Sequence, residues 1–252
     1  MRWDGRALVV PAALLILAEI GARASGPSDS VAPPSAVLAA FVEALGDGSL
    51  LIATRDTLAS AFGGLAIGGA IGLALGVLFG ALRPLDRLME VTVELVRPIP
   101  SVALIPVALV ALGFGYRLEI AIVSFSCLWP LLVLSRSAVA NVEPRLIEVA
   151  RVLRLGPFAR IFKIVAPAAL PRIFVAFRLA AGISLVVAVT VEIAVNPMGL
   201  GAGIMTAGQA LRPDAMLAYV LWIGLIGFGL NEALTFAQNR LFGQAARIAG
   251  EP

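Results

Sequence analysis

The stretch NVEPRLIEVARVLRLGPFARIFKIVAPAALP, residues 141–171, is a basic interval between two strongly apolar runs at residues 120–134 and 173–195. A basic loop between two membrane-spanning helices lies on the cytoplasmic side when the positive-inside rule holds. The interval therefore predicts a membrane protein and also its orientation. Its basic residues are Arg145, Arg151, Arg154, Arg160 and Lys163.

The same stretch has the apolar spacing of a short amphipathic helix. Residues at i, i+3, i+4 and i+7 form one apolar face, namely Leu146, Val149, Ala150 and Leu153. Pro144 suits a first helical turn, and Gly156 followed by Pro157 predicts the end of this helix. A second short amphipathic segment follows, and Pro167 and Pro171 open the next apolar run. The pattern predicts a helical hairpin presented to the cytosol.

The composition places the chain in the membrane. Of its 252 residues 60% are hydrophobic and 14% charged, whereas soluble domains average about 25% charged residues. Histidine is absent and Cys127 is the only cysteine, which excludes histidine-based metal sites, a Ser-His-Asp triad and an intrachain disulfide. No P-loop surrounds Lys163, so the chain is not expected to bind ATP itself. The net charge of +3 is better explained by cytoplasmic loops than by nucleic acid.

Six apolar runs predict six membrane-spanning helices with both termini in the cytoplasm. The runs cover about residues 7–22, 58–82, 89–112, 118–139, 170–195 and 216–236. The first run competes with a cleavable signal peptide, but Glu19 within it favours an uncleaved span. Residues 34–45 predict a short amphipathic helix near the outer surface.

Five glycines recur every fourth residue in the second predicted span. They are Gly64, Gly68, Gly72, Gly76 and Gly80, and this spacing places them along one helical face. Small residues let membrane helices pack with their backbones close together. The preferred interpretation is tight packing against a neighbouring helix, and the alternative is a contact in a dimer.

The third predicted span contains groups that are costly against lipid. Glu94 and Arg97 are three residues apart, and Pro98 and Pro100 interrupt the helix. Broken backbone and charge are tolerated in a membrane where they line protein or a water-filled cavity. The segment therefore lines a translocation path, or Glu94 and Arg97 form a structural ion pair near the inner interface.

The motif Glu148-Val149-Ala150, followed by the segment IVAPAALP at residues 164–171, resembles the EAA loop of ABC importer permeases. In that family the loop forms the coupling helices that dock on the ATPase subunit. The resemblance implies a coupling role for residues Glu148, Val149, Ala150, Arg151, Arg154 and Gly156. Arg154 stands where the family usually has glycine, so the turn is expected to shift to Gly156. The alternative is a solvated basic loop without a partner.

The resemblance covers essentially the whole chain and is closest to permeases of nitrate, sulfonate, taurine and bicarbonate importers. It implies an all-α type I permease fold of six transmembrane helices in one domain, residues 1–252, in a bacterial inner membrane. The implied partners are a second copy of the chain, a cytoplasmic ATPase dimer that binds ATP and Mg, and a periplasmic solute-binding protein. The chain would be a permease without a cofactor rather than an enzyme, and a small anion is the expected solute.

The resemblance also places the Arg97–Pro100 segment close to the translocation path, and it places a glutamate, here Glu192, before a glycine-rich segment. Glu192 would gate the external mouth or hydrogen-bond the loop beside it. A secondary transporter is the alternative function, although we find neither an internal repeat nor many charges deep in the spans. An intramembrane enzyme would need a nucleophile with a base, and the apolar surroundings of Cys127 offer none.

Overall fold

The computed structural model describes residues 9–24, 26 and 31–243, and the elements in this part of the chain are helical. In chain order they are α1 (Val9–Ala24), α2 (Pro34–Gly46), α3 (Ser49–Ala81), α4 (Arg83–Val96), the 3₁₀ turn η2 (Ser101–Leu104), α5 (Ile105–Leu112), α6 (Tyr116–Ala140), α7 (Pro144–Val152), α8 (Pro157–Arg160), the π turn η3 (Ile161–Val165), α9 (Ala166–Ala194), α10 (Leu200–Gln209) and α11 (Pro213–Phe242). The all-α class predicted from the sequence is confirmed.

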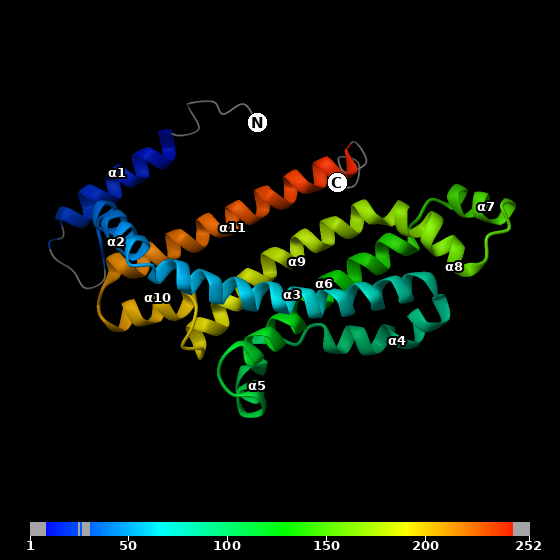
Figure 1. Ribbon diagram of the computed structural model, residues 1–252, viewed down its shortest axis with the longest axis horizontal. Coiled ribbons are helices and arrows are strands. Elements are labelled where there is room, and N and C mark those ends of the chain that lie inside the picture. The colour runs from blue at the N-terminus through cyan, green and yellow to red at the C-terminus, as the bar shows by residue number, and fades with distance from the viewer. Residues whose placement is uncertain (1–8, 25, 27–30, 244–252) are drawn as a thin grey trace.

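The long helices α3, α6, α9 and α11 run along the length of the molecule (Figure 1). The short helices α1, α2 and α10 gather at one end of this bundle, and α7 and α8 lie at the other (Figure 1). The predicted hairpin and the predicted amphipathic helix of residues 34–45 thus occupy opposite ends. The two ends of the bundle therefore carry different short helices.

Among the described residues, four helices are long and apolar enough to cross a membrane, namely α3, α6, α11 and α9 together with η3. A fifth crossing is formed if α4 and the segment from η2 to α5 count as one span, bent by 76° at residues 97–100. The described part of α1 has 16 residues, or about 24 Å at 1.5 Å per residue, against a hydrocarbon core of about 30 Å. The predicted first span begins at Ala7, outside the described residues. The count of six spans is therefore not confirmed.

The glycine face of α3 packs directly on the backbone of α6. A Cβ atom at Gly68 or Gly72 would overlap the carbonyl group of Ser124 or Leu128. At Gly76, a Cβ would lie 2.6 Å from the carbonyl oxygen of Leu132. Gly64 and Gly80 are equally close to α6, at Val123 and at Arg136 with Val139. The two helices are in backbone contact within one chain.

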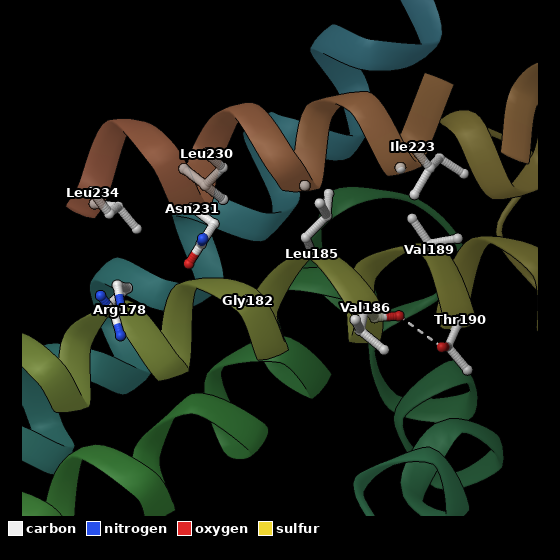
Figure 2. Close-up of a pocket in the computed structure, with 12 residues that line it drawn as sticks. Arg178, Gly182, Leu185, Val186, Val189, Thr190, Ile223, Leu230, Asn231 and Leu234 are labelled. Atoms are coloured by element: carbon white, nitrogen blue, oxygen red, sulfur yellow. Dashed lines mark hydrogen bonds between the residues drawn. The ribbon is translucent and has the colours of Figure 1, made fainter. Parts of the chain in front are cut away.

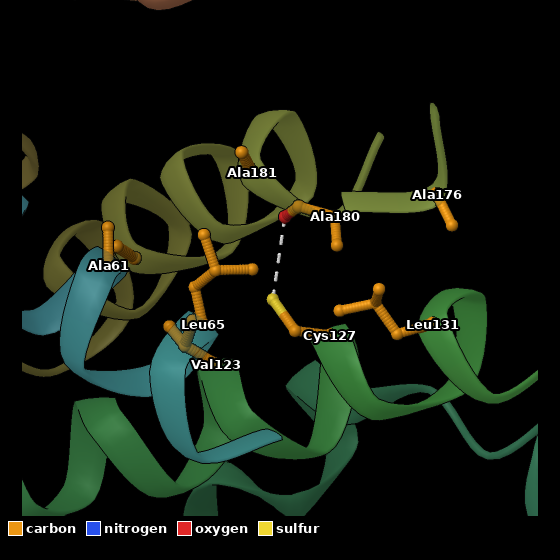
Figure 3. Close-up of a cluster of buried hydrophobic side chains, with 9 residues drawn as sticks. Ala61, Leu65, Val123, Cys127, Leu131, Ala176, Ala180 and Ala181 are labelled. Carbon is orange, nitrogen blue, oxygen red and sulfur yellow. Dashed lines mark hydrogen bonds between the residues drawn. The ribbon is translucent and has the colours of Figure 1, made fainter. Parts of the chain in front are cut away.

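The core of the bundle lies between α3, α6 and α9. Leu65 of α3 and Val123 and Cys127 of α6 pack against a row of alanines on α9, namely Ala176, Ala180, Ala181 and Ala188 (Figure 3). The thiol of Cys127 is fully buried and lies 3.5 Å from the carbonyl oxygen of Ala180. Small side chains on α9 allow this close approach.

Candidate functional site

The helix α7 presents an apolar surface at the end of the bundle. Ala150 is 1% exposed and Ile147 packs against the cluster around Ala138 and Val165, so these two residues attach α7 to the bundle. Val149, by contrast, is exposed, and Val152 is 83% exposed. The predicted apolar face is therefore partly wrong, because Ile147 takes an inward position while Val149 and Leu153 face outward. Exposed apolar side chains in a cluster mark an interaction surface.

The charged residues of α7 face solvent beside these apolar groups. Glu148 and Arg151 are exposed, and neither forms an ion pair with another described residue. Arg145 lies 3.9 Å from Glu143, and both side chains remain largely exposed. We call the exposed side chains of Glu148, Val149, Arg151, Val152 and Leu153 the α7 surface. It offers charge and apolar area together, as a docking surface does.

The turn after α7 is closed at Arg154 rather than at Gly156. Arg154 has a φ of +50°, a left-handed conformation that favours glycine. The N–H of Leu155 donates to the carbonyl of Ala150 at 3.0 Å, and the N–H of Arg154 donates to that of Arg151 at 3.0 Å. This pair of bonds is a Schellman motif. The expected shift of the turn to Gly156 is therefore wrong. The left-handed residue is Arg154, at the position where the family usually has glycine.

The bend between α4 and η2 contains Arg97, Pro98 and Pro100, and all three are exposed in the single chain. Proline lacks a backbone N–H, so Pro98 and Pro100 cannot continue the helical hydrogen bonds of α4, which ends at Val96. Within the described residues, no ion pair joins Glu94 to Arg97, so the structural salt bridge considered for this span is not formed. Instead α4 is tied to α6 by Asp86, whose Oδ1 lies 2.6 Å from Nε of Arg136.

Glu192 is 2% exposed and hydrogen-bonds the loop that follows α9. Its Oε2 accepts a hydrogen bond from the backbone N–H of Gly201 at 2.7 Å. Gly201 stands in the first turn of α10, where backbone N–H groups lack helical partners and a negative charge is favourable. At Gly199, which has a φ of +91°, a Cβ would overlap the Glu192 carboxylate. Glu192 thus caps the N-terminus of α10, although it precedes Gly201 by nine residues in the sequence.

Further buried polar groups surround Glu192 and were missed by the sequence analysis. The hydroxyl of Thr57 on α3 accepts a hydrogen bond from the N–H of Leu200 at 2.9 Å. Asn196 donates to Oε2 of Glu119 at 2.7 Å, and its own Oδ1 accepts from the N–H of Gly115 at 3.0 Å. The available signal in the sequence was Glu119, an acidic residue at the start of the apolar run at residues 118–139. These bonds join α3, α6, α9 and α10 at one end of the bundle.

Arg178 was also missed, although it lies within the fifth predicted span. It lines a cavity of about 490 Å³ between α9 and α11 (Figure 2). Its Nη1 donates to Oγ1 of Thr235 at 3.3 Å and to Oε1 of Gln238 at 3.2 Å, both on α11. The signal was a charged residue within a predicted span, which in a membrane points to function by default.

The described residues form a helical membrane protein with an exposed surface of apolar and charged side chains, the α7 surface, at one end. Residues 68–243 match the family described as binding-protein-dependent transport system inner membrane component. The chain belongs to this family, and it is therefore an integral inner-membrane component of a transport system rather than an enzyme.

Individual relatives extend over most of the chain. A protein of Methanocaldococcus jannaschii, named as an ABC transporter permease, is 34% identical over 205 residues, which are 80% of this chain and 76% of that protein. The bicarbonate transport system permease protein CmpB of Synechocystis sp. is 29% identical over 77% of this chain and 69% of its own length. The aliphatic sulfonates transport permease protein SsuC of Bacillus subtilis is 26% identical over 94% of this chain and 86% of its own.

Two further relatives are named for nitrate and for taurine transport. The nitrate import permease protein NrtB of Leptolyngbya laminosa is 26% identical over 68% of this chain and 61% of its own length. The taurine transport system permease protein TauC of Escherichia coli is 27% identical over 68% of this chain and 62% of its own length.

Solved structures share the fold. A chain of the MetNI methionine ABC transporter superposes with a TM-score of 0.65 at 22% identity, over 78% of this chain and 94% of that chain. A chain of an amino acid ABC transporter gives a TM-score of 0.66 at 16% identity, over 80% of this chain and 98% of that chain. The bundle is thus the fold of ABC importer permeases.

Proposed function

We propose that this chain is the transmembrane permease subunit of an ATP-driven importer for a small anion, and that it works by alternating access. The family and the names of the relatives, which are permeases for bicarbonate, sulfonates, nitrate and taurine, support this proposal. Two copies of the chain form the path, and a periplasmic binding protein delivers the solute. A cytoplasmic ATPase dimer binds ATP and Mg, and the permease itself needs no cofactor.

The observation that carries the proposal is the α7 surface. An isolated solvated loop would turn its apolar residues inward, yet Val149, Val152 and Leu153 are 48%, 83% and 60% exposed. Glu148 and Arg151 stand among them without ion-pair partners in the described chain. A groove on an ATPase subunit that buries the three apolar side chains and pairs the two charges would satisfy both needs.

The helix behind this surface supplies the mechanical connection. The turns of α8 and η3 lead into α9, and residues Ile161–Ala194 form one apolar helix of 34 residues, roughly 51 Å long at 1.5 Å per residue. Its far end holds Glu192 and the cap of α10. A displacement of α7 during ATP binding therefore tilts α9 and moves the α10 end of the bundle.

In this mechanism we assign the bend after α4 to the translocation path and Glu192 to its outer gate. Arg97, Pro98 and Pro100 are exposed in the single chain, where a second copy would enclose them. Glu192 anchors α10 and would release or tighten it as α9 tilts. We assign residues 1–252 to a single permease domain, with α7 and both termini in the cytoplasm and α2 on the periplasmic side.

The proposal is tested by charge reversal on the α7 surface. The permease is purified with the ATPase encoded next to it and reconstituted into liposomes with the cognate binding protein. Uptake of nitrate, bicarbonate, taurine and ethanesulfonate is measured with ATP hydrolysis. We expect Glu148→Arg to lower uptake at least tenfold, because it places a cation where the groove accommodates an anion, and to weaken ATPase co-purification.

The matched control is Glu43→Arg, which reverses an exposed charge on α2 at the other end of the bundle. It should leave ATPase co-purification unchanged. If no ATPase co-purifies with the unmodified permease, or if Glu148→Arg imports like the parent, the assignment of the α7 surface is wrong.

A further inference from the structure

The cavity between α9 and α11 contains a cation with no carboxylate partner. Arg178 is the only charged residue among those that line it, and no ion pair to Arg178 occurs in the described chain. Its side-chain hydrogen bonds to described residues leave from one nitrogen, Nη1, toward neutral oxygens of Thr235 and Gln238. A guanidinium has five N–H donors, so Nε and Nη2 remain available.

A second donor lines the same end of the cavity. Asn231 projects from α11 toward α9 near Arg178, and its carboxamide makes no hydrogen bond to a described residue (Figure 2). The remaining hydroxyl of the lining, on Thr190, already donates to the carbonyl oxygen of Val186 at 2.7 Å. The other lining side chains are apolar. Arg178 and Asn231 are thus the polar groups free to bind a molecule in this space.

The orientation of Arg178 is fixed by its neighbours. The hydroxyl proton of Thr235 is engaged by the carbonyl oxygen of Asn231 at 2.8 Å, which turns a lone pair of Oγ1 toward Arg178. Gln238, 5% exposed, holds the same nitrogen with its Oε1. Two acceptors therefore hold Nη1 of the guanidinium, and Arg178 lines the cavity with Nε and Nη2 unbonded to described residues. This arrangement prepares a planar donor fork for an incoming group.

We infer that Arg178 and Asn231 bind the anionic group of the transported solute in the cavity between α9 and α11. Two parallel N–H donors of a guanidinium match a carboxylate, a sulfonate, nitrate or bicarbonate, and the amide N–H of Asn231 adds a third donor. The cavity of about 490 Å³ is within the size range of small-molecule sites. Its apolar walls accommodate the rest of an organic anion.

The depth of Arg178 favours a solute over a phospholipid. Eight residues separate it from Leu170, where the predicted fifth span begins, which is about 12 Å along the axis. Headgroup phosphates lie at the edges of a hydrocarbon core about 30 Å thick, so a lipid would have to bring its headgroup well inside the bilayer. A transported anion must cross this depth. The inference rests on the proposed function and adds the position of the anion within the permease.

The test separates the positive charge from the helix contact that Arg178 also makes. The reconstituted complex is assayed for uptake of nitrate, taurine, bicarbonate and ethanesulfonate, and in parallel for ATP hydrolysis stimulated by the liganded binding protein. We expect Arg178→Gln to lower uptake at least tenfold while stimulated hydrolysis stays within twofold of the parent.

The control is the double variant Thr235→Val with Gln238→Leu, which removes both acceptors on α11 but keeps the arginine. It should import several times faster than Arg178→Gln. An equal loss in the double variant would show that Arg178 only joins two helices and would overturn the inference.

Two other results are distinguished in the same assay. If the parent complex imports a probe and Arg178→Gln imports it equally well, the inference fails while the proposed function stands, and phosphorus analysis of the purified complexes then shows whether a phospholipid was lost. If the parent complex imports none of the probes in an ATP-dependent way, the proposed function fails with it.

Discussion

Arg154 closes the turn after α7 in a backbone conformation that its side chain does not favour. The left-handed region costs an L-residue roughly 1–2 kcal/mol, and glycine avoids most of this cost. The nearby glycine, Gly156, has no positive φ, and a Cβ placed there would meet nothing within 4 Å. The backbone strain of this loop therefore lies at Arg154, whereas the glycine that could relieve such strain lies at residue 156.

We expect Arg154→Gly to stabilise the end of α7 by about 0.5–1 kcal/mol, because it relieves the left-handed strain at the expense of a more flexible unfolded chain. Hydrogen exchange of the amides at residues 149–155 measures this local stability. Gly156→Ala is the comparison, and it should be neutral or slightly stabilising. Loss of protection in Gly156→Ala, without a gain in Arg154→Gly, would mean that the turn lies at Gly156 after all.

At this scale the sequence identified Glu192 but not its partners. From the sequence, Glu192 could either gate the external mouth or hydrogen-bond the loop beside it. The structure shows the hydrogen bond, which Glu192 accepts from the N–H of Gly201. Thr57 and Asn196 carried no signal, because their role depends on three helices meeting. Arg178 was visible as a charge within an apolar run and was overlooked for lack of a recognised motif around it.

At the scale of elements, α3 and α6 pack with their backbones in contact. A Cβ at Gly72 would overlap the carbonyl oxygen of Leu128, which belongs to the backbone and cannot rotate away. Only a shift of one whole helix would make room. The four-residue glycine spacing therefore fixes both the distance and the register of this pair.

We expect Gly72→Ala to lower the free energy of unfolding by about 1–3 kcal/mol, the usual cost of overpacking. The midpoint of thermal unfolding in detergent measures the change. Gly229→Ala on α11 is the matched control, because a Cβ there has nothing within 4 Å, and it should be close to neutral. Equal midpoints for the two variants would be incompatible with backbone contact between α3 and α6.

The long helices were predictable from hydropathy, but their ends were not. Helix α3 begins at Ser49, whereas the apolar run begins near residue 58, because the helix continues through Arg55 and Asp56 beyond the apolar core. Helix α10 was missed altogether, since Gly199, Gly201 and Gly203 weaken the helical signal. Small residues are needed there because Glu192 and Tyr219 pack against them.

At the scale of the whole molecule, the two ends of the bundle are chemically distinct. Arg145 on α7 is 89% exposed at one end, and Glu43 on α2 is 72% exposed at the other. The proposed orientation places the first in the cytoplasm and the second in the periplasm. Hydropathy predicts six spans, whereas the described residues contain four, or five if the pair bent by 76° is one span, and the predicted first span begins outside them.

We expect a cysteine at Arg145 to react with a membrane-impermeant thiol reagent only after the inner membrane is opened, and a cysteine at Glu43 to react in intact spheroplasts. The parent chain is its own control, because its only cysteine, Cys127, is fully buried. Labelling is read on the purified protein. The reverse pattern would invert the proposed orientation, and labelling of both sites from one side would contradict the span arrangement.

The contact between α3 and α6 also bears on how the chain is made. Between the end of α3 at Ala81 and the end of α6 at Ala140, 59 residues must be synthesised, which takes roughly 3–12 seconds at usual translation rates. During that interval the glycine face of α3 has no partner within its own chain, and its backbone borders the insertion machinery or lipid. Release of α3 into the bilayer before α6 emerges would leave this groove open to other helices. Orderly biogenesis therefore favours retention of α3 at the insertion site until α6 arrives.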